Sequence, residues 1–119
     1  EPRRDLRLAI TRVVNVVNAN DDVLLLAGRL GGAEERLPPE WEPYVRRFVR
    51  ACEQRIRRDQ ERGVAANDID AAIAARALCA MVERHLVLDV IRGGLDANDS
   101  IYTLSELWYR GVYSLPAAA

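Results

Sequence analysis

The chain has one histidine, His85, and it lies in the strongly apolar segment MVERHLVLDVI at residues 81–91. An imidazole ring can both donate and accept a hydrogen bond, so it rarely lies in an apolar setting without a partner. Two interpretations fit: a core or interface residue whose ring is satisfied by its neighbours, or a polar contact in a ligand cavity. The sequence alone leaves both open.

The other residues capable of chemistry form no catalytic pattern. Glu83 and Arg84 are adjacent on a predicted helix, so their side chains point in different directions. We find no nucleophile beside a base, no paired carboxylates at a defined spacing and no phosphate-cradling glycine loop. An enzyme built on Glu83, His85 or Glu106 would require these side chains to converge in one pocket. We therefore predict that the chain is not an enzyme and needs no cofactor.

Cys52 and Cys79 occupy apolar positions of two different predicted helices. They lack the spacing of metal ligands, and there is no second histidine to join them. We interpret them as two free, buried thiols in a reducing compartment and predict no metal site.

Composition limits the size of the domain and its partners. With 119 residues, half of them hydrophobic, the chain can bury one core, so we take residues 1–119 as a single domain. The net charge of -1, from 17 basic and 18 acidic residues, does not favour binding to DNA through this part. The arginines between positions 46 and 62 mark the solvated face of a helix, on which Glu53, Asp59 and Glu61 dilute the positive charge. No apolar run is long enough for a membrane span, and EPRRDLR does not resemble a signal peptide, so we expect a soluble, cytoplasmic protein without membrane contact.

Apolar residues recur at helical spacing almost throughout, which predicts an all-α fold with five helices. The first two helices should cover about residues 3–20 and 21–30. The third carries its stripe from Trp41 to Ile56 and stops at Gly63. The remaining helices are expected to run from a cap at Asn67 or Asp68 to Ile91, where Gly93 and Gly94 close the helix, and over about residues 99–114, from a cap at Asn98 or Asp99.

Helices four and five are apolar on more than one side. The segment AAIAARALCAMV, residues 71–82, contains one charge, Arg76, and the fifth helix has both an aliphatic and a tyrosine stripe. One small domain cannot easily cover both helices, so we predict a two-fold homodimer that buries at least about 800 Å² per subunit. The residues predicted for its interface are Ala71, Ala75, Leu86, Ile101, Tyr102, Leu104, Tyr109, Val112 and Tyr113.

Three segments carry a resemblance to a known family. They are EWEPYVRRFVRACEQRIRRDQERGVA from Glu40, DIDAAIAARALCAMVERHL from Asp68 and SIYTLSELWYRGVYS from Ser100. This order resembles the C-terminal ligand-binding and dimerisation domain of the TetR family of transcriptional repressors. The resemblance implies that the last two helices build a four-helix dimer interface. It also implies that the chain is the C-terminal part of a longer regulator, which contacts operator DNA only through an N-terminal helix-turn-helix domain absent here.

The resemblance further implies a small, largely apolar effector that enters among helices one, three and four. Val82 would form an apolar wall of its pocket, and His85, three residues further on, would supply a polar group. The residues predicted to bind the effector are Trp41, Tyr44, Phe48, Leu78, Val82, His85 and Trp108. For Trp41, Tyr44 and Phe48 the alternative is ordinary core packing, and for Trp108 it is the dimer interface. The rival function is a helical dimerisation or protein-interaction module without a ligand cavity.

Overall fold

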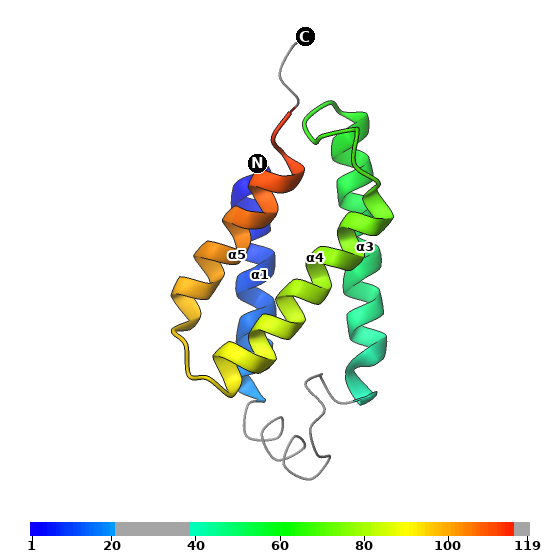
Figure 1. Cartoon of the computed structure of the whole chain (residues 1–119). Coiled ribbons are helices and arrows are strands. Elements are labelled where there is room, and N and C mark those ends of the chain that lie inside the picture. Colours follow the sequence, from blue (N-terminus) through cyan, green and yellow to red (C-terminus); the bar gives the residue numbers. More distant parts are fainter. Residues whose placement is uncertain (21–38, 116–119) are drawn as a thin grey trace.

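The computed structural model describes residues 1–20 and 39–115 (Figure 1). Its α-helices are α1 (Pro2–Ala19), α3 (Glu42–Glu61), α4 (Ala71–His85) and α5 (Ala97–Val112). A 3-10 turn (Pro39–Trp41) precedes α3, and a π-helical segment (Leu86–Ile91) continues α4. The described residues contain no strand, which confirms an all-α fold for this part of the chain. The helix predicted at residues 21–30 lies outside the described residues.

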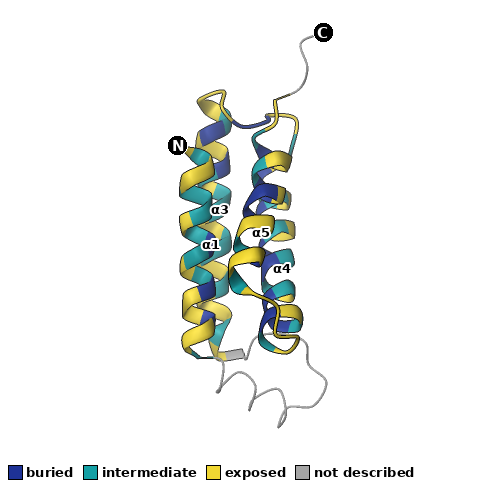
Figure 2. Ribbon diagram, turned by 90° about the vertical axis from the view of Figure 1, so that its left-hand side faces the viewer, coloured by how far each residue is buried: buried dark blue, intermediate teal, exposed yellow. Residues whose placement is uncertain are grey.

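The helices form two layers, with α1 and α3 in one layer and α4 and α5 in the other (Figure 2). Across the layers α1 packs along α5, and α3 packs along α4. Each helix turns its apolar stripe inward, so that all four contribute to one core. The buried residues of that core include Ile10, Val14 and Val17 from α1, Ile56 from α3, Ala75 and Val82 from α4, and Leu104, Trp108 and Val112 from α5.

The N-terminal caps of α4 and α5 are not at the residues that we predicted. The Asp70 carboxylate accepts a hydrogen bond from the backbone N–H of Ile73 at 2.9 Å, and Asp96 caps α5 in the same way. Both aspartates have extended backbone, as a cap requires. The predicted caps (Asn67 or Asp68, and Asn98 or Asp99) are wrong because each helix start contains several Asn and Asp residues. Composition alone does not select among them.

The predicted fourth helix does reach Ile91, but its last part changes from α to π geometry. The backbone N–H of Arg92 donates to the carbonyl of Val87 at 3.2 Å, five residues back. The wider turn lets Leu86, Val87 and Val90 all lie in the core. Gly94 closes the segment with a φ of +71°, as predicted, whereas Gly93 is required because a Cβ there would lie 2.7 Å from the carbonyl oxygen of Asp89.

Candidate functional site

His85 is the last residue of α4, and both of its ring nitrogens have partners. Nδ1 lies 2.9 Å from Oδ2 of Asp89, and Nε2 lies 2.8 Å from Oγ of Ser100 on α5. Because an ionised carboxylate only accepts, Nδ1 carries a hydrogen in this arrangement and, in the neutral ring, Nε2 accepts from the Ser100 hydroxyl. His85 thus joins the end of α4 to the first turn of α5. For His85 to contact an effector through Nε2, its hydrogen bond with Ser100 must break.

The order serine, histidine, aspartate is also that of an acyl-transfer triad. In this protein, however, Ser100 is only 4 % exposed, so a substrate carbonyl has no approach to its hydroxyl in this conformation. The arrangement therefore supports a structural link and gives no support to catalysis. Neither Ser100 nor Asp89 is among the residues predicted from the sequence, although Asp89 stands four residues after His85, the spacing at which helical side chains meet.

Five of the seven residues predicted to bind an effector belong to one apolar cluster. Val82 and Trp108 lie in the core, and Trp41, Phe48 and Leu78 are half-buried and pack against it. The cluster therefore brings together side chains from α3, α4, α5 and the turn before α3.

Tyr44 does not join this cluster, since it is 65 % exposed. The guanidinium carbon of Arg47 lies 5.4 Å from the centre of its ring, which is a cation–π distance. Tyr44 thus contributes to the outer surface of α3 in this conformation.

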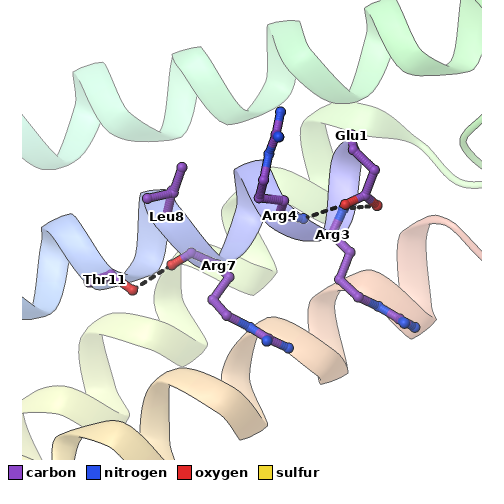
Figure 3. Close-up of a pocket in the computed structure, with 6 residues that line it drawn as sticks. All are labelled: Glu1, Arg3, Arg4, Arg7, Leu8 and Thr11. Carbon is purple, nitrogen blue, oxygen red and sulfur yellow. Dashed lines mark hydrogen bonds between the residues drawn. The ribbon is translucent and has the colours of Figure 1, made fainter.

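A pocket of about 410 Å³ lies elsewhere, on the outer side of α1 (Figure 3). Its lining consists of Glu1, Arg3, Arg4, Arg7, Leu8 and Thr11, and so contains none of the residues predicted for the effector. The Glu1 carboxylate accepts from the backbone N–H groups of Arg4 and Arg3, which lowers its pKa below the ordinary value. All six lining residues belong to α1 or its N-terminal cap, whereas the resemblance implies a pocket among several helices.

A buried carboxylate, Asp59, links α3 to its neighbours. Asp59 is 0 % exposed, and its Oδ2 accepts from the Tyr113 hydroxyl at 2.5 Å and from Nε of Arg55 at 2.8 Å. Nη2 of Arg55 also donates to Asp5 on α1 at 3.1 Å. These contacts hold α1, α3 and the C-terminal end of α5 in one arrangement.

The pKa shifts in this group follow from its contacts. The hydrogen bond to Asp59 raises the pKa of Arg55, and the hydrogen bond from Arg55 lowers the pKa of Asp5. Burial, followed by the hydrogen bond to Asp59, raises the pKa of Tyr113 well above its ordinary value. The arginine-rich sequence around Asp59 predicts a solvated charge, and this prediction is wrong because Asp59 is buried. The missed signal is that Asp59 continues the stripe of Cys52 and Ile56 at helical spacing.

Glu106 on α5 is the centre of a second charged group. It is buried, and guanidinium nitrogens of Arg3, Arg7 and Arg110 lie 3.3 Å from its oxygens. Arg3 and Arg7 come from α1, so this group also joins α1 to α5. The partners of Glu106 differ from those of His85, so these two side chains do not share one set of contacts, as the enzyme hypothesis would require.

The residues predicted for the dimer interface are mostly engaged within the chain. Five of them (Ala71, Ala75, Leu86, Leu104 and Val112) are buried in the core. Tyr109 and Tyr113 stack with ring centres 5.5 Å apart, and Arg3 lies over Tyr109. Ile101 packs partly against the core, whereas Tyr102 is exposed. The second apolar side of α4 and α5 therefore serves in large part to pack on α3 and α1.

Residues 6–114 match a family model for the C-terminal domain of a regulator, which makes the chain a TetR-like regulatory domain. The family is the one described as "Transcriptional regulator EthR, C-terminal domain", and the chain belongs to it. This is a family of regulators and not of enzymes. No curated protein and no solved structure compared with the chain matches it. Within residues 1–20 and 39–115, no helix is long and apolar enough to cross a membrane.

Proposed function

We propose that the chain is the effector-sensing and dimerisation domain of a TetR-like transcriptional regulator. A small, mostly apolar effector binds to it and releases the full-length protein from operator DNA. The observation that carries this proposal is the family match over residues 6–114. DNA contact belongs to the N-terminal helix-turn-helix domain that the resemblance implies, in keeping with the net charge of -1 of this chain.

The effector site that we propose lies along the packed helices α3 and α4. Phe48 and Leu78 are half-buried there and pack against the core cluster to which the buried Val82 belongs. A half-buried apolar side chain still exposes area to water, and an effector that covers this area gains roughly 25 cal/mol per Å². His85 follows Val82 on α4 and can offer Nε2 to a polar group of the effector in exchange for Ser100.

For the dimer, we propose the solvent-exposed sides of α4 and α5. Apolar or small residues recur there at helical spacing: Ile73, Ala77 and Ala80 on α4, and Leu107 and Gly111 on α5. Ile73 and Leu107 are 68 % and 54 % exposed, and a second copy of the chain would remove both from water. Alanine and glycine allow the facing helices to approach closely. The buried members of the predicted interface, Ala71, Ala75, Leu86, Leu104 and Val112, would lie in the core below this surface and hold its helices in place.

Effector binding can change operator binding only if the effector has different affinities for two arrangements of the dimer. The Asp59 and Glu106 groups join α1 to α3 and α5, so a shift of those helices displaces α1. The resemblance to the TetR family implies that α1 is the helix nearest to the DNA-binding domain. Two recognition helices must lie about 34 Å apart to enter successive major grooves, so a small rotation weakens operator binding.

The effector site is tested with two matched variants, Leu78→Gln in the apolar cluster of α4 and Val16→Gln on the exposed side of α1. The measurement is the affinity of the chain for an uncharged apolar fluorescent probe, with circular dichroism to verify folding. We expect Leu78→Gln to weaken binding at least about tenfold, equal to about 1.4 kcal/mol, and Val16→Gln to leave it unchanged. Equal effects of the two variants would refute the site. A stable dimer that binds no member of a broad panel of apolar compounds would favour the rival module without a cavity.

A further inference from the structure

Cys52 of α3 and Cys79 of α4 face each other across the packed pair of helices. They lie at matching distances from the turn that connects α3 to α4, and the next pair towards that turn, Ile56 and Ala75, is buried in the core. Cys79 belongs to the core and Cys52 packs against it, and each thiol is the leading cause of the shift in the other's pKa. Both thiols are free, as predicted, but only Cys79 is buried, and the prediction did not place the two together.

The spacing of packed helices suits a disulfide at this position. Helix axes in contact lie about 8–10 Å apart, and each Cα lies about 2.3 Å from its own axis, so directly facing Cα atoms are about 3.4–5.4 Å apart. Disulfides span Cα separations of about 4.4–6.8 Å. The two helices can therefore form this bond without a large movement.

The two thiols differ in their environment. Cys52 is half-buried, so a small oxidant can reach it, whereas Cys79 is buried. The hydrogen bond from Cys79 lowers the pKa of Cys52, while the same bond and burial raise the pKa of Cys79. Because Cys52 is the more exposed of the two, a peroxide reaches it first, and Cys79 is then the second thiol.

We propose that Cys52 and Cys79 form a redox site, at which a hydroperoxide produces a disulfide between α3 and α4. The Cys52 thiolate attacks the terminal oxygen of the hydroperoxide, the O–O bond breaks, and an alcohol leaves after protonation. The sulfur of Cys79 then attacks the resulting sulfenic acid, releasing water as the S–S bond forms. In total, two thiols and one hydroperoxide give one disulfide, one alcohol and one water. The two thiols are oxidised by two electrons, and the peroxide oxygen is reduced.

The disulfide would fix the separation of α3 and α4 next to the effector site proposed above. Phe48 is one turn from Cys52 on α3, and Leu78 directly precedes Cys79 on α4. Oxidation would thus change how far these two helices can part to admit an apolar effector. This consequence rests on the proposed function, whereas the thiol chemistry does not.

The test treats the reduced chain with tert-butyl hydroperoxide in the presence of a metal chelator. We expect the intact mass to fall by two hydrogen atoms, a proteolytic fragment in which Cys52 is linked to Cys79, and full reversal by dithiothreitol. In Cys79→Ala, oxidation should stop at a sulfenic acid on Cys52 that dimedone traps. In Cys52→Ala, oxidation of Cys79 should be at least about tenfold slower than oxidation of Cys52 in Cys79→Ala.

Three results would overturn the proposal. The first is a folded chain whose thiols resist the peroxide while the same thiols react in urea. The second is a disulfide that forms only between chains and disappears on dilution. The third is faster oxidation of Cys79 than of Cys52 in the two single variants. Because these readouts need no effector, a failure to bind apolar compounds would refute the effector proposal without affecting the redox site.

Discussion

Removal of the Tyr113 hydroxyl should destabilise the protein, because this hydroxyl is one of two hydrogen-bond donors to the buried Asp59 carboxylate. Its distance to Oδ2 is 2.5 Å. The other oxygen of Asp59, Oδ1, has no hydrogen-bond partner among the described residues, and Nη1 of Arg62 lies 3.6 Å from it. Hydrogen bonds to charged groups contribute about 1.5–3 kcal/mol. Since Arg55 remains at 2.8 Å in the variant, we expect Tyr113→Phe to lower the free energy of unfolding by about 2 kcal/mol.

Asp59→Asn should lower the free energy of unfolding by a similar amount. Loss of one partner of a buried ion pair costs about 3–5 kcal/mol, but Arg55 is partly exposed and keeps Asp5, so we expect about 2–3 kcal/mol. Asparagine also retains an acceptor for Tyr113. The double variant should therefore be less destabilised than the sum of the two single variants, with a coupling of about 1–2 kcal/mol.

Urea unfolding followed by circular dichroism measures these energies. All variants need the same chain concentration, because dimerisation would add to the apparent stability. The matched control is Tyr44→Phe on the exposed side of α3, which should change the unfolding free energy by less than about 0.5 kcal/mol. A Tyr113→Phe variant as stable as this control, or strictly additive energies in the double variant, would refute the role given to Asp59.

Three further predictions concern pH, His85 and the dimer. The pKa of Tyr113 is raised above 10.0, so its contribution to stability is complete below pH 10 and is lost as the pH rises further; in Tyr113→Phe, the fall in urea midpoint between pH 10 and 12 should be shallower. Ser100→Ala should lower the unfolding free energy by about 1–2 kcal/mol because His85 loses a partner; an unchanged urea midpoint would show that this bond contributes nothing. Leu107→Arg should raise the dimer dissociation constant at least about tenfold in sedimentation equilibrium, whereas Val16→Arg, equally exposed on α1, should leave it unchanged; equal effects would exclude α5 from the interface.

The helices could be predicted from the sequence because an amphipathic helix repeats its pattern over many residues. The stripe on α3 from Trp41 to Ile56 places that helix correctly, and Gly63 ends it with a φ of +75°. Single-residue features have no such redundancy. Asp70 and Asp96 are caps because of their backbone conformation, and neighbouring Asn and Asp residues offer the same chemistry.

The partners of buried polar groups could not be predicted either, because they come from distant parts of the chain. Nothing in the local sequence of Asp59 indicates that Tyr113 approaches it, and nothing beside His85 indicates Ser100. The same limit affected the dimer surface. A helix that is apolar on two sides must pack against a partner on each side. Periodicity does not show which partner belongs to the same chain and which to a second copy.

Native mass spectrometry of the chain, titrated with a panel of uncharged apolar compounds, tests the central claim most directly. We predict a dimer of two 13.4 kDa chains that retains at least one of these compounds, at up to one molecule per chain, and binds it less well after Leu78→Gln. A monomer that retains none of them would contradict both the dimerisation and the effector-sensing role.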